Sequence, residues 1–488
     1  MLRRLLKDQP NPDSIAVIED DREIRYRELQ QKAFALQLSL PAEPQENIAI
    51  LLPNGGDFIA AFWGVISTGK IAFPLNVLMT KHEILPLLKQ ASVKKIITSL
   101  KYKSIFEDAR AYGDVALTVI YMENIGSSTS GPGSISENID PEKPAVLLGT
   151  SGTVGKSKIV QLTEKNIEAS VLGYLERLRC DRNHSSAIRF LLTMPFSSAY
   201  GLMMISACLR YSFPIVLFNH IFTLDLFYHT VEKHKITHYE GSTSTIVLMG
   251  QLSDKPILYD ICTLRYCGFG GSKISGNAIK KLSRAFPEIG FYQGYGMTEA
   301  SPLIAKHPEQ KLEKADSVGL AIQGLEIGVE TEKGITHAPE VIGEIVVKGT
   351  NVMLGYLENE KETKHTVKKG YLHTGDIGYL DEEGYLFIRG RKKNMIIVRG
   401  FNVYPEEVED CIQNSHLVKE CRVYARQDKF ENEMICADVV PINSLIRAET
   451  IKSYCEEHLA EYKRPRMISL CKSIQKNLSG KITRQKEI

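Results

Sequence analysis

Buried-strand patterns alternate with helical patterns over the first third of the chain. The apolar run Asn47–Leu52 predicts a buried strand, and a helical pattern of apolar residues follows over Phe58–Thr68. Lys95–Thr98 predicts another strand, and Ala145–Leu148 predicts a further strand that leads into a glycine-rich loop. Such alternation is typical of an α/β fold with largely parallel sheets.

A second alternating block runs from Ile188 to Leu303, with strands predicted at Ile215–Leu217 and Thr263–Cys267. Near residue 315 the pattern changes to short β-type runs between turn residues, namely Glu326–Glu330, Gly343–Val347 and Gly384–Ile388. These runs predict a compact β-rich subdomain over about 315–390.

The last hundred residues have a third pattern. Pro405–Ile412 and Glu449–His458 are helical in pattern, and Cys421–Ala425 between them is a strand pattern. We therefore predict two domains, an N-terminal one over 1–391 and a small α+β domain over 393–488.

Composition narrows the function classes. A chain of 488 residues exceeds what one hydrophobic core usually supports. Its 60 basic and 58 acidic residues give a net charge of +2, so bulk charge does not point to nucleic acid or an anionic membrane. The nine cysteines form no CxxC pair, which argues against a zinc site or a disulfide framework. Residues 1–8 lack the apolar core of a secretory signal, and Lys70 and Arg210 interrupt the most apolar stretches. We expect a cytoplasmic protein without an integral membrane segment.

The glycine-rich loop Gly149–Lys158 is the first candidate for chemistry. Its glycines, interleaved with hydroxyl residues, would turn backbone N–H groups toward one concavity that binds phosphate. A Walker A loop is the rival interpretation, because Gly155-Lys156-Ser157 matches its end. Its opening glycine, however, would have to stand at position 150, which is Thr150. A flexible surface turn is the alternative without function.

Further motifs follow this loop in a fixed order. They are Tyr295-Gly-Met-Thr-Glu299, Gly343-Glu-Ile-Val-Val-Lys-Gly349 with Gly355-Tyr356, Tyr371-Leu-His-Thr-Gly-Asp376, Gly390-Arg-Lys-Lys-Asn394, Gly400-Phe-Asn-Val-Tyr-Pro-Glu-Glu407 and Ser479-Gly-Lys-Ile-Thr-Arg484. The series resembles the adenylate-forming superfamily, which includes acyl- and aryl-CoA synthetases, over nearly the whole chain. The resemblance implies a large N-terminal domain of two mostly parallel sheets flanked by helices, a small β-barrel-like subdomain and a mobile α+β C-terminal domain.

The resemblance also implies ATP, Mg²⁺ and CoA as cofactors. It places the β- and γ-phosphates of ATP on the loop residues Thr150, Ser151, Gly152, Thr153, Gly155 and Lys158. Thr298 would contact the α-phosphate, and Glu299 would hold Mg²⁺, a hard cation that prefers oxygen ligands. The adenine would lie against Gly270, Gly271 and Ser272, with Tyr295 and Gly296 beside it, while Asp376 and Arg391 would hold the ribose.

The remaining implied residues concern the acid and the C-terminal domain. The acid pocket would be lined by Ser198, Tyr200, Tyr239, Gly268 and Met297. Lys481 would reach across the domain cleft as the catalytic lysine, with Thr298 and Glu299 completing the catalytic set. Lys393 would be the hinge between the two half-reactions, and Gly400 would line a tunnel for the pantetheine arm.

Three departures from the family pattern concern the loop and the acid pocket. The loop ends with Ser157 and Ile159 where the family usually has proline and glycine. Ser198 stands where many acyl-CoA synthetases have histidine, and Gly241-Ser242-Thr243 lacks a proline common in the family. The acid is therefore the part of the function that the sequence defines least.

Three functions remain open at this level. The first is a ligase that activates a fatty or aromatic carboxylic acid with ATP and forms its CoA thioester. The second loads the same adenylate onto the phosphopantetheine of an acyl carrier protein. The third is a nucleotide-binding relative without catalysis. In each case the expected partners are small molecules or a carrier protein, with no nucleic acid.

Overall fold

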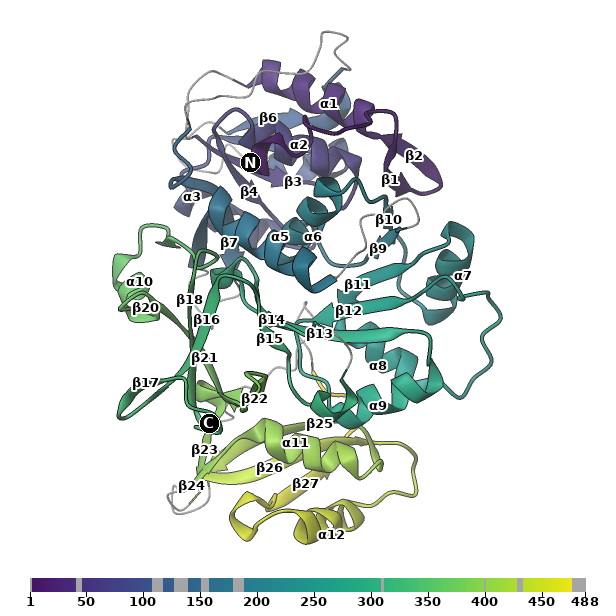
Figure 1. The fold of residues 1–488 in the computed structure, drawn as a ribbon, viewed down its shortest axis with the longest axis vertical. Helices are drawn as coiled ribbons and strands as arrows, with labels where there is room; N and C mark the ends of the chain where they lie inside the picture. The colour runs from purple at the N-terminus through teal and green to yellow at the C-terminus, as the bar shows by residue number, and fades with distance from the viewer. Residues whose placement is uncertain are drawn as a thin grey trace.

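The computed structural model describes residues 2–40, 46–107, 117–126, 139–150, 158–178, 188–308, 311–398, 401–427 and 433–475. Figure 1 shows two large sheets with their helices, a third sheet beside them and a smaller C-terminal unit at one end. The α/β fold class predicted from the sequence is confirmed. Within the described residues no helix is long and apolar enough to cross a membrane.

The first large sheet has the strand order β19-β8-β7-β4-β3-β5-β6. Its strands are β3 (Asn47–Leu51), β4 (Ile71–Pro74), β5 (Lys95–Thr98), β6 (Thr118–Tyr121), β7 (Pro144–Thr150), β8 (Lys158–Thr163) and β19 (Gly355–Tyr356). Strands β3 to β7 run parallel, whereas β8 and β19 are antiparallel additions at one edge. Residues 48–51 of β3 are fully buried, which is why this strand reads as a continuous apolar run.

The second large sheet has the order β15-β14-β13-β12-β11-β9-β10-β1-β2. Its strands are β1 (Ile15–Glu19), β2 (Arg22–Arg25), β9 (Phe190–Leu192), β10 (Ile215–Leu217), β11 (His238–Ser242), β12 (Tyr266–Gly270), β13 (Gly290–Gly296), β14 (Leu303–Lys306) and β15 (Leu320–Ala321). Six neighbouring strands of this sheet pair in parallel, in the order β13, β12, β11, β9, β10 and β1. Antiparallel strands lie at both edges, β2 beside β1 and β14 with β15 beside β13.

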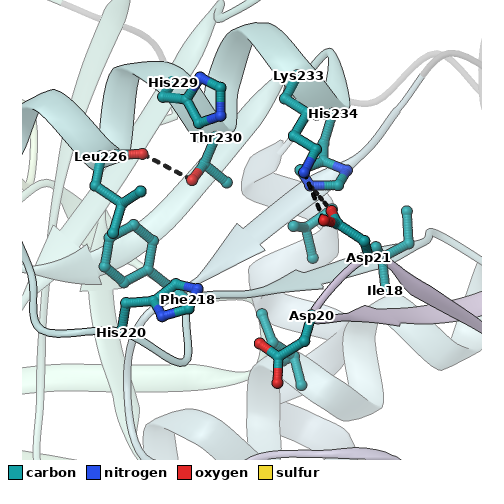
Figure 2. Close-up of a pocket in the computed structure, with 12 residues that line it drawn as sticks. Ile18, Asp20, Asp21, Phe218, His220, Leu226, His229, Thr230, Lys233 and His234 are labelled. Carbon is teal, nitrogen blue, oxygen red and sulfur yellow. Dashed lines mark hydrogen bonds and ion pairs between the residues drawn. The ribbon is translucent and has the colours of Figure 1, made fainter.

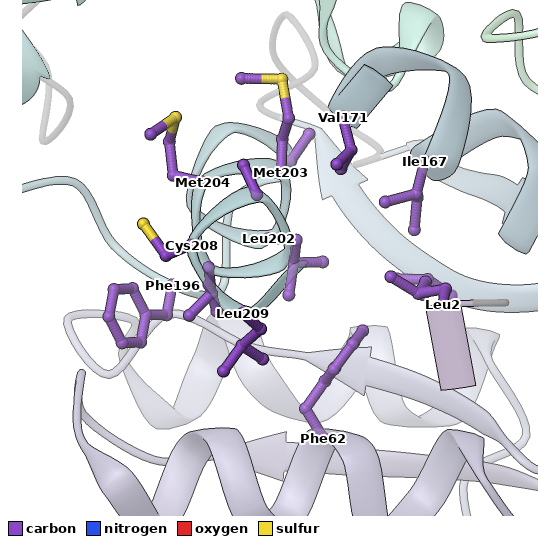
Figure 3. Close-up of a cluster of buried hydrophobic side chains, with 14 of the residues drawn as sticks. Leu2, Phe62, Ile167, Val171, Phe196, Leu202, Met203, Met204, Cys208 and Leu209 are labelled. Carbon is purple, nitrogen blue, oxygen red and sulfur yellow. The ribbon is translucent and has the colours of Figure 1, made fainter. Parts of the chain in front are cut away.

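Helices cover both faces of these sheets. They are α1 (Tyr26–Ser39), α2 (Gly56–Ile66), α3 (Lys81–Gln90), α4 (Lys103–Glu107), α5 (Glu164–Leu178), α6 (Ala199–Arg210), α7 (Leu224–His234), α8 (Thr243–Gln251) and α9 (Gly276–Ala285). Side chains of α2, α5 and α6 pack with both sheets in one large apolar cluster. Figure 3 shows Phe62 of α2, Val171 of α5 and Leu202 of α6 among the members of this cluster. This cluster holds the two sheets together and so fixes the strand ends that carry the site.

The third sheet is antiparallel and lies beside the second one. It contains β16 (Leu325–Thr331), β17 (Gly334–Thr336), β18 (Gly343–Gly349), β20 (Val367–Lys368), β21 (Tyr371–Leu380) and β22 (Leu386–Arg391), with α10 (Glu360–Thr366) before β20. This sheet corresponds to the β-rich subdomain predicted from the sequence.

The C-terminal unit combines a hairpin, a three-stranded sheet and two helices. Its elements are β23 (Ile396–Val398), β24 (Phe401–Val403), α11 (Pro405–Asn414), β25 (Val418–Gln427), β26 (Glu433–Pro441), α12 (Ala448–His458) and β27 (Met467–Leu470). A separate apolar cluster joins the sheet to α11 and α12. The division of the chain at residues 391–393 stays a proposal.

Two strands begin later than their sequence patterns predict. The strand expected at Thr263–Cys267 is β12, which starts at Tyr266, because the Leu264 N–H bonds to the carbonyl of Ile261 in a turn. The strand expected at Gly384–Ile388 is β22, which starts at Leu386. Both strands extend into glycine or arginine positions of low β-propensity, so tertiary pairing determines their ends.

Acid pH is expected to destabilise the fold through His238 on β11. Burial lowers the pKa of His238 from 6.5 to about 4, and its ring lies 4.9 Å from the Phe190 ring and 5.2 Å from the Tyr266 ring. The unfolded chain therefore takes up a proton near pH 6.5 that the folded chain accepts only near pH 4. Stability from this residue is full above pH 6.5 and falls by up to about 3 kcal/mol toward pH 4.

A His238→Phe variant tests this, because phenylalanine keeps the aromatic packing and cannot titrate. The urea unfolding midpoint of the native protein should fall relative to that of the variant between pH 6.5 and pH 4.5, because only the native protein contains the titrating His238. A difference between the two midpoints that stays constant over this range would contradict the role given to His238.

Candidate active site

The candidate site lies at the carboxyl ends of the parallel strands β11, β12 and β13 (Figure 1). In open α/β sheets ligands bind in the crevice at this edge. Gly270 ends β12 and Gly296 ends β13, and Thr298 and Glu299 follow within one short helical turn. The structure thus brings together the adenine, phosphate and metal residues that the resemblance implied at separate places in the chain.

Asp376 on β21 is held by two side chains. The Tyr295 hydroxyl donates a hydrogen bond of 2.6 Å to Oδ2, and Arg391 Nε lies 2.6 Å from Oδ1. Burial raises the pKa of Tyr295, and the nearby carboxylate raises it further, so the hydroxyl keeps its proton and remains a donor. Asp376 and Arg391 are directly opposite each other on β21 and β22. The pairing fixes the orientation of the Asp376 carboxylate.

Glu299 is linked to the end of the glycine-rich loop through Tyr356 on β19. The Tyr356 hydroxyl donates to Glu299 Oε1 at 2.9 Å, and Lys158 Nζ lies 5.0 Å from the centre of the Tyr356 ring. Lys158 also forms an ion pair with Glu362 of α10. Burial raises the pKa of Tyr356, and Glu299 raises it further, which keeps this hydroxyl protonated as well. The residues implied for Mg²⁺ and for the terminal phosphates are therefore neighbours.

The secondary structure around the loop excludes the Walker A interpretation. Strands β7 and β8 on either side of it are antiparallel partners, with Thr150 opposite Lys158. A Walker A loop leads instead from a strand into a helix. The loop residues Ser151, Gly152, Thr153 and Gly155 lie outside the described residues.

The glycines near the strand ends leave room that side chains would fill. A Cβ at Gly296 would lie 1.7 Å from the carbonyl oxygen of Pro302, so only glycine fits there. Gly271 has φ +95, a backbone conformation that favours glycine. The Thr243 hydroxyl lies 3.1 Å from the carbonyl of Gly270 and 2.9 Å from that of Ser272, and so holds this turn in place.

The residues expected in the acid pocket separate into distinct positions. Ser198 caps α6, because its Oγ accepts the Gly201 N–H at 3.0 Å and donates to the Pro195 carbonyl at 2.7 Å. Tyr200 on α6 is partly exposed and donates a hydrogen bond to Glu240. Met297 is partly buried immediately before Thr298.

Tyr239 lies on the opposite face of the second sheet from Glu240. Its side chain is fully buried in an apolar cluster, and its hydroxyl lies 2.9 Å from Thr193 Oγ1. Gly268, the last of the expected pocket residues, is buried directly beneath the Glu240 carboxylate.

Next to the expected hinge, Lys392 pairs with β18, and a separate ion pair joins the C-terminal unit to the rest of the chain. Lys392 Nζ lies 2.8 Å from Glu344 of β18, and Lys273 Nζ lies 2.5 Å from Asp410 of α11. Burial lowers the pKa of Lys393, and the Arg391 charge adds to the effect. Gly400 and Lys481 lie outside the described residues.

A separate surface pocket carries none of the expected site residues. It lies between β1, β10 and α7 and is lined by acidic and basic side chains. Figure 2 shows Lys233 and His234 directed at Asp21, with Lys233 Nζ 2.6 Å from Oδ2 and His234 Nε2 3.4 Å from Oδ1. These two basic side chains thus pair with the Asp21 carboxylate.

Sequence reasoning did not assign roles to three residues that shape the candidate site. Tyr356 was quoted only as part of a motif, Thr243 only as a departure from one, and Glu240 not at all. Only Glu240 could have been found from the sequence, because it is a charged residue inside the otherwise strand-like run His238–Ser242.

Comparisons with known proteins extend over both parts of the chain. A family model described as AMP-binding enzyme matches residues 6–357, and one described as AMP-binding enzyme C-terminal domain matches residues 407–481. A 2-succinylbenzoate–CoA ligase of Bacillus cereus is 30% identical over 486 residues, covering 97% of this chain and 95% of that ligase.

Two solved structures of o-succinylbenzoate CoA synthetase from Bacillus subtilis are also similar. The complex with the acyl-adenylate intermediate has a TM-score of 0.84 and 27% identity, covering 99% of this chain and 96% of that chain. The complex with ATP and magnesium ion has a TM-score of 0.83 and 27% identity, covering 99% and 97%.

Proposed function

Because the chain belongs to the AMP-binding enzyme family and is an AMP-forming acid–thiol ligase, we propose that it joins an aromatic carboxylic acid to CoA. The acid would first attack the α-phosphate of ATP, giving an acyl-adenylate and pyrophosphate. The thiol of CoA would then displace AMP. The observation that carries this proposal is that two carboxylates are each held by a tyrosine around the end of β13: Asp376 by Tyr295 of that strand, and Glu299, in the turn after it, by Tyr356.

The nucleotide would lie along the carboxyl ends of β12 and β13. Asp376 would accept hydrogen bonds from the ribose hydroxyls, and Arg391 and Tyr295 keep its carboxylate in one orientation. The adenine would fit beside Gly270 and Gly271, where the chain has no side chains to obstruct a flat ring. Thr298, at the start of the turn after β13, would contact the α-phosphate.

Glu299 has the chemistry that a magnesium site needs. Its carboxylate is nearly buried, and the Tyr356 hydrogen bond engages Oε1. Carboxylate oxygen is a preferred Mg²⁺ ligand, and the ion usually completes its coordination with phosphate oxygens and water. When bound, Mg²⁺ would offset the phosphate charge. Glu299 would hold it, and Tyr356 would orient Glu299.

The proposed acid and the proposed thiol acceptor rest on the similarity of this chain to the relatives described above. The relatives described above act on 2-succinylbenzoate, an aromatic acid, and this favours an aromatic acid over a fatty acid here. The same relatives are CoA ligases, so we propose CoA rather than a carrier protein as the acceptor.

The two-domain division belongs to the same proposal. We place the N-terminal domain at 1–391 and the mobile C-terminal domain at 393–488, with Lys393 as the hinge. The ion pair of Lys273 with Asp410 would hold one arrangement of the two domains, and the ion pair of Lys392 with Glu344 would fix the residue next to the hinge to β18. Rotation would exchange Lys481 for the segment around Gly400 at the site.

An acid-dependent ATP–pyrophosphate exchange assay tests the function. Benzoic, cinnamic, succinylbenzoic and straight-chain fatty acids should be compared, each with CoA and with holo-carrier protein as acceptors. We expect exchange with an aromatic acid and thioester formation with CoA alone. Absence of exchange with every acid would refute the proposed activity, and preferential loading of the carrier protein would reassign the acceptor.

Replacing Asp376 with asparagine should weaken ATP binding about 10- to 100-fold, because a hydrogen bond to a charged group is worth roughly 1.5–3 kcal/mol. Isothermal titration with ATP measures the change. Asp381→Asn is the matched control, since Asp381 follows the far end of the same strand and pairs with Lys314. Equal affinities of the Asp376 variant and the native protein would contradict the ribose contact.

A further inference from the structure

A fully buried carboxylate on β11 lies against Tyr200 and Gly268, two of the residues expected to line the acid pocket. Glu240 is 0% exposed and accepts hydrogen bonds from Tyr174 of α5 at 2.9 Å and from Tyr200 of α6. Lys306 of β14 lies with its Nζ 3.2 Å from Oε1 and is itself almost completely buried. Side chains from three other elements, α5, α6 and β14, thus converge on Glu240.

The group is internally satisfied. Glu240 Oε1 receives Tyr174 and Lys306, while Oε2 receives Tyr200. Burial raises the pKa of Tyr174 and Tyr200, and the Glu240 charge raises both further, so the hydroxyls stay protonated as donors. Separating these partners would leave a buried charge without compensation, which is strongly unfavourable. The group therefore resists displacement by an apolar ligand.

Glycine in the neighbouring strand is what allows this carboxylate its place. A Cβ at Gly268 of β12 would lie 2.0 Å from Glu240 Oε1. The carboxylate therefore occupies the space directly above β12, on the face of the sheet that α5 and α6 cover. Gly268 was expected to line the acid pocket, but the Glu240 carboxylate fills the space next to it.

The position of Glu240 along its strand gives its depth. Ser242 ends β11, so Glu240 lies two residues, or about 7 Å, below the strand end where the nucleotide residues gather. An acid whose carboxylate meets the α-phosphate near Thr298 would direct its tail from that edge into the sheet–helix space. The tail would meet Tyr200, which is partly exposed, and then the Glu240 group.

We propose that Glu240, Lys306, Tyr174 and Tyr200 form the end wall of the acid pocket and restrict the enzyme to compact acids. This inference rests on the proposed function and adds a limit on the substrate's length. A single ring with a short side chain ends before the wall. A long alkyl tail would have to separate a buried ion pair, and so is rejected.

The test compares acids of increasing length in the pyrophosphate exchange assay. One series runs from benzoate through phenylacetate and 3-phenylpropionate to 6-phenylhexanoate, and the other consists of straight-chain acids from four to sixteen carbons. The native enzyme should show at least a 100-fold fall in kcat/KM between its best compact acid and the longest member of each series.

The decisive variant is Glu240→Ala combined with Lys306→Met, which shortens the wall and removes both charges together. We expect the ratio of kcat/KM for the long acids to kcat/KM for the best compact acid to rise at least tenfold. The matched control is Glu168→Ala with Arg210→Met. It removes an ion pair between α5 and α6, the helices that carry Tyr174 and Tyr200, at a position away from Glu240. ATP titration and thermal unfolding confirm that each variant is folded.

A second variant keeps the test decisive if the double variant fails to fold. Tyr200→Ala shortens only the partly exposed member of the wall and should relax the same length limit. Equal use of long and compact acids by the native enzyme would overturn the inference, as would an unchanged length profile in a folded wall variant. Absence of exchange with any acid would instead refute the proposed function, and the inference with it.

Discussion

Replacing Lys481 with alanine is expected to slow adenylate formation by about 100- to 1,000-fold, the usual effect of removing one charge-stabilising donor. The step joins a carboxylate to a phosphate, so negative charge concentrates where the two meet. A lysine ammonium placed there offsets this charge. ATP binding should change little, because the held carboxylates Asp376 and Glu299 lie on the other side of the proposed hinge.

The second half-reaction separates this role from a general loss of structure. If the C-terminal domain rotates about Lys393, Lys481 leaves the site before CoA attacks. Thioester formation from a supplied acyl-adenylate should then stay within about threefold of the native rate. Lys472→Ala is the control, an exposed lysine close to β27 in the same unit.

Equal losses in both half-reactions would contradict the role of Lys481 in adenylation alone. Unimpaired adenylation would show that another cation supplies the charge. Both rates follow from the same preparation, by exchange of labelled pyrophosphate and by release of AMP from the synthetic adenylate.

The fold could be predicted where burial dominates the sequence pattern. Strand β3 is buried on both faces and reads as a continuous apolar run, and β5 and β10 have the predicted bounds. Strand β12 is less visible, because Gly268 and Gly270 lower its β-propensity. Those glycines are there because Glu240 and the strand β13 backbone approach closely, which only the assembled sheet reveals.

The candidate site was predictable as a set of residues and not as a set of contacts. Ordered motifs named Asp376 and Arg391, but their pairing depends on the register between β21 and β22. Likewise the Tyr356 bond to Glu299 joins an edge strand of one sheet to the turn after a strand of another. Contacts between distant segments leave no periodic signal in one sequence, and so Glu240, Tyr174 and Lys306 were not predicted from the sequence.

Glu299→Gln is expected to reduce adenylation by at least about 100-fold at low magnesium concentration, because the amide keeps the shape and removes the charge that holds the cation. The glutamine oxygen can still accept from Tyr356, so the local structure should persist. Raising the Mg²⁺ concentration should recover part of the rate, because the variant loses affinity for the cation. Measuring the exchange rate across a magnesium titration gives both the loss at low magnesium concentration and the recovery at high concentration.

Two further variants distinguish charge from orientation at this position. Tyr356→Phe leaves the Glu299 charge and removes one hydrogen bond, so its loss should stay near tenfold, consistent with about 1–2 kcal/mol. Glu360→Gln removes an exposed carboxylate of nearby α10 and should have no effect. If Glu299→Gln lowers the rate equally at every magnesium concentration, Glu299 does not hold the ion. Its role would then lie in positioning the turn that carries Thr298.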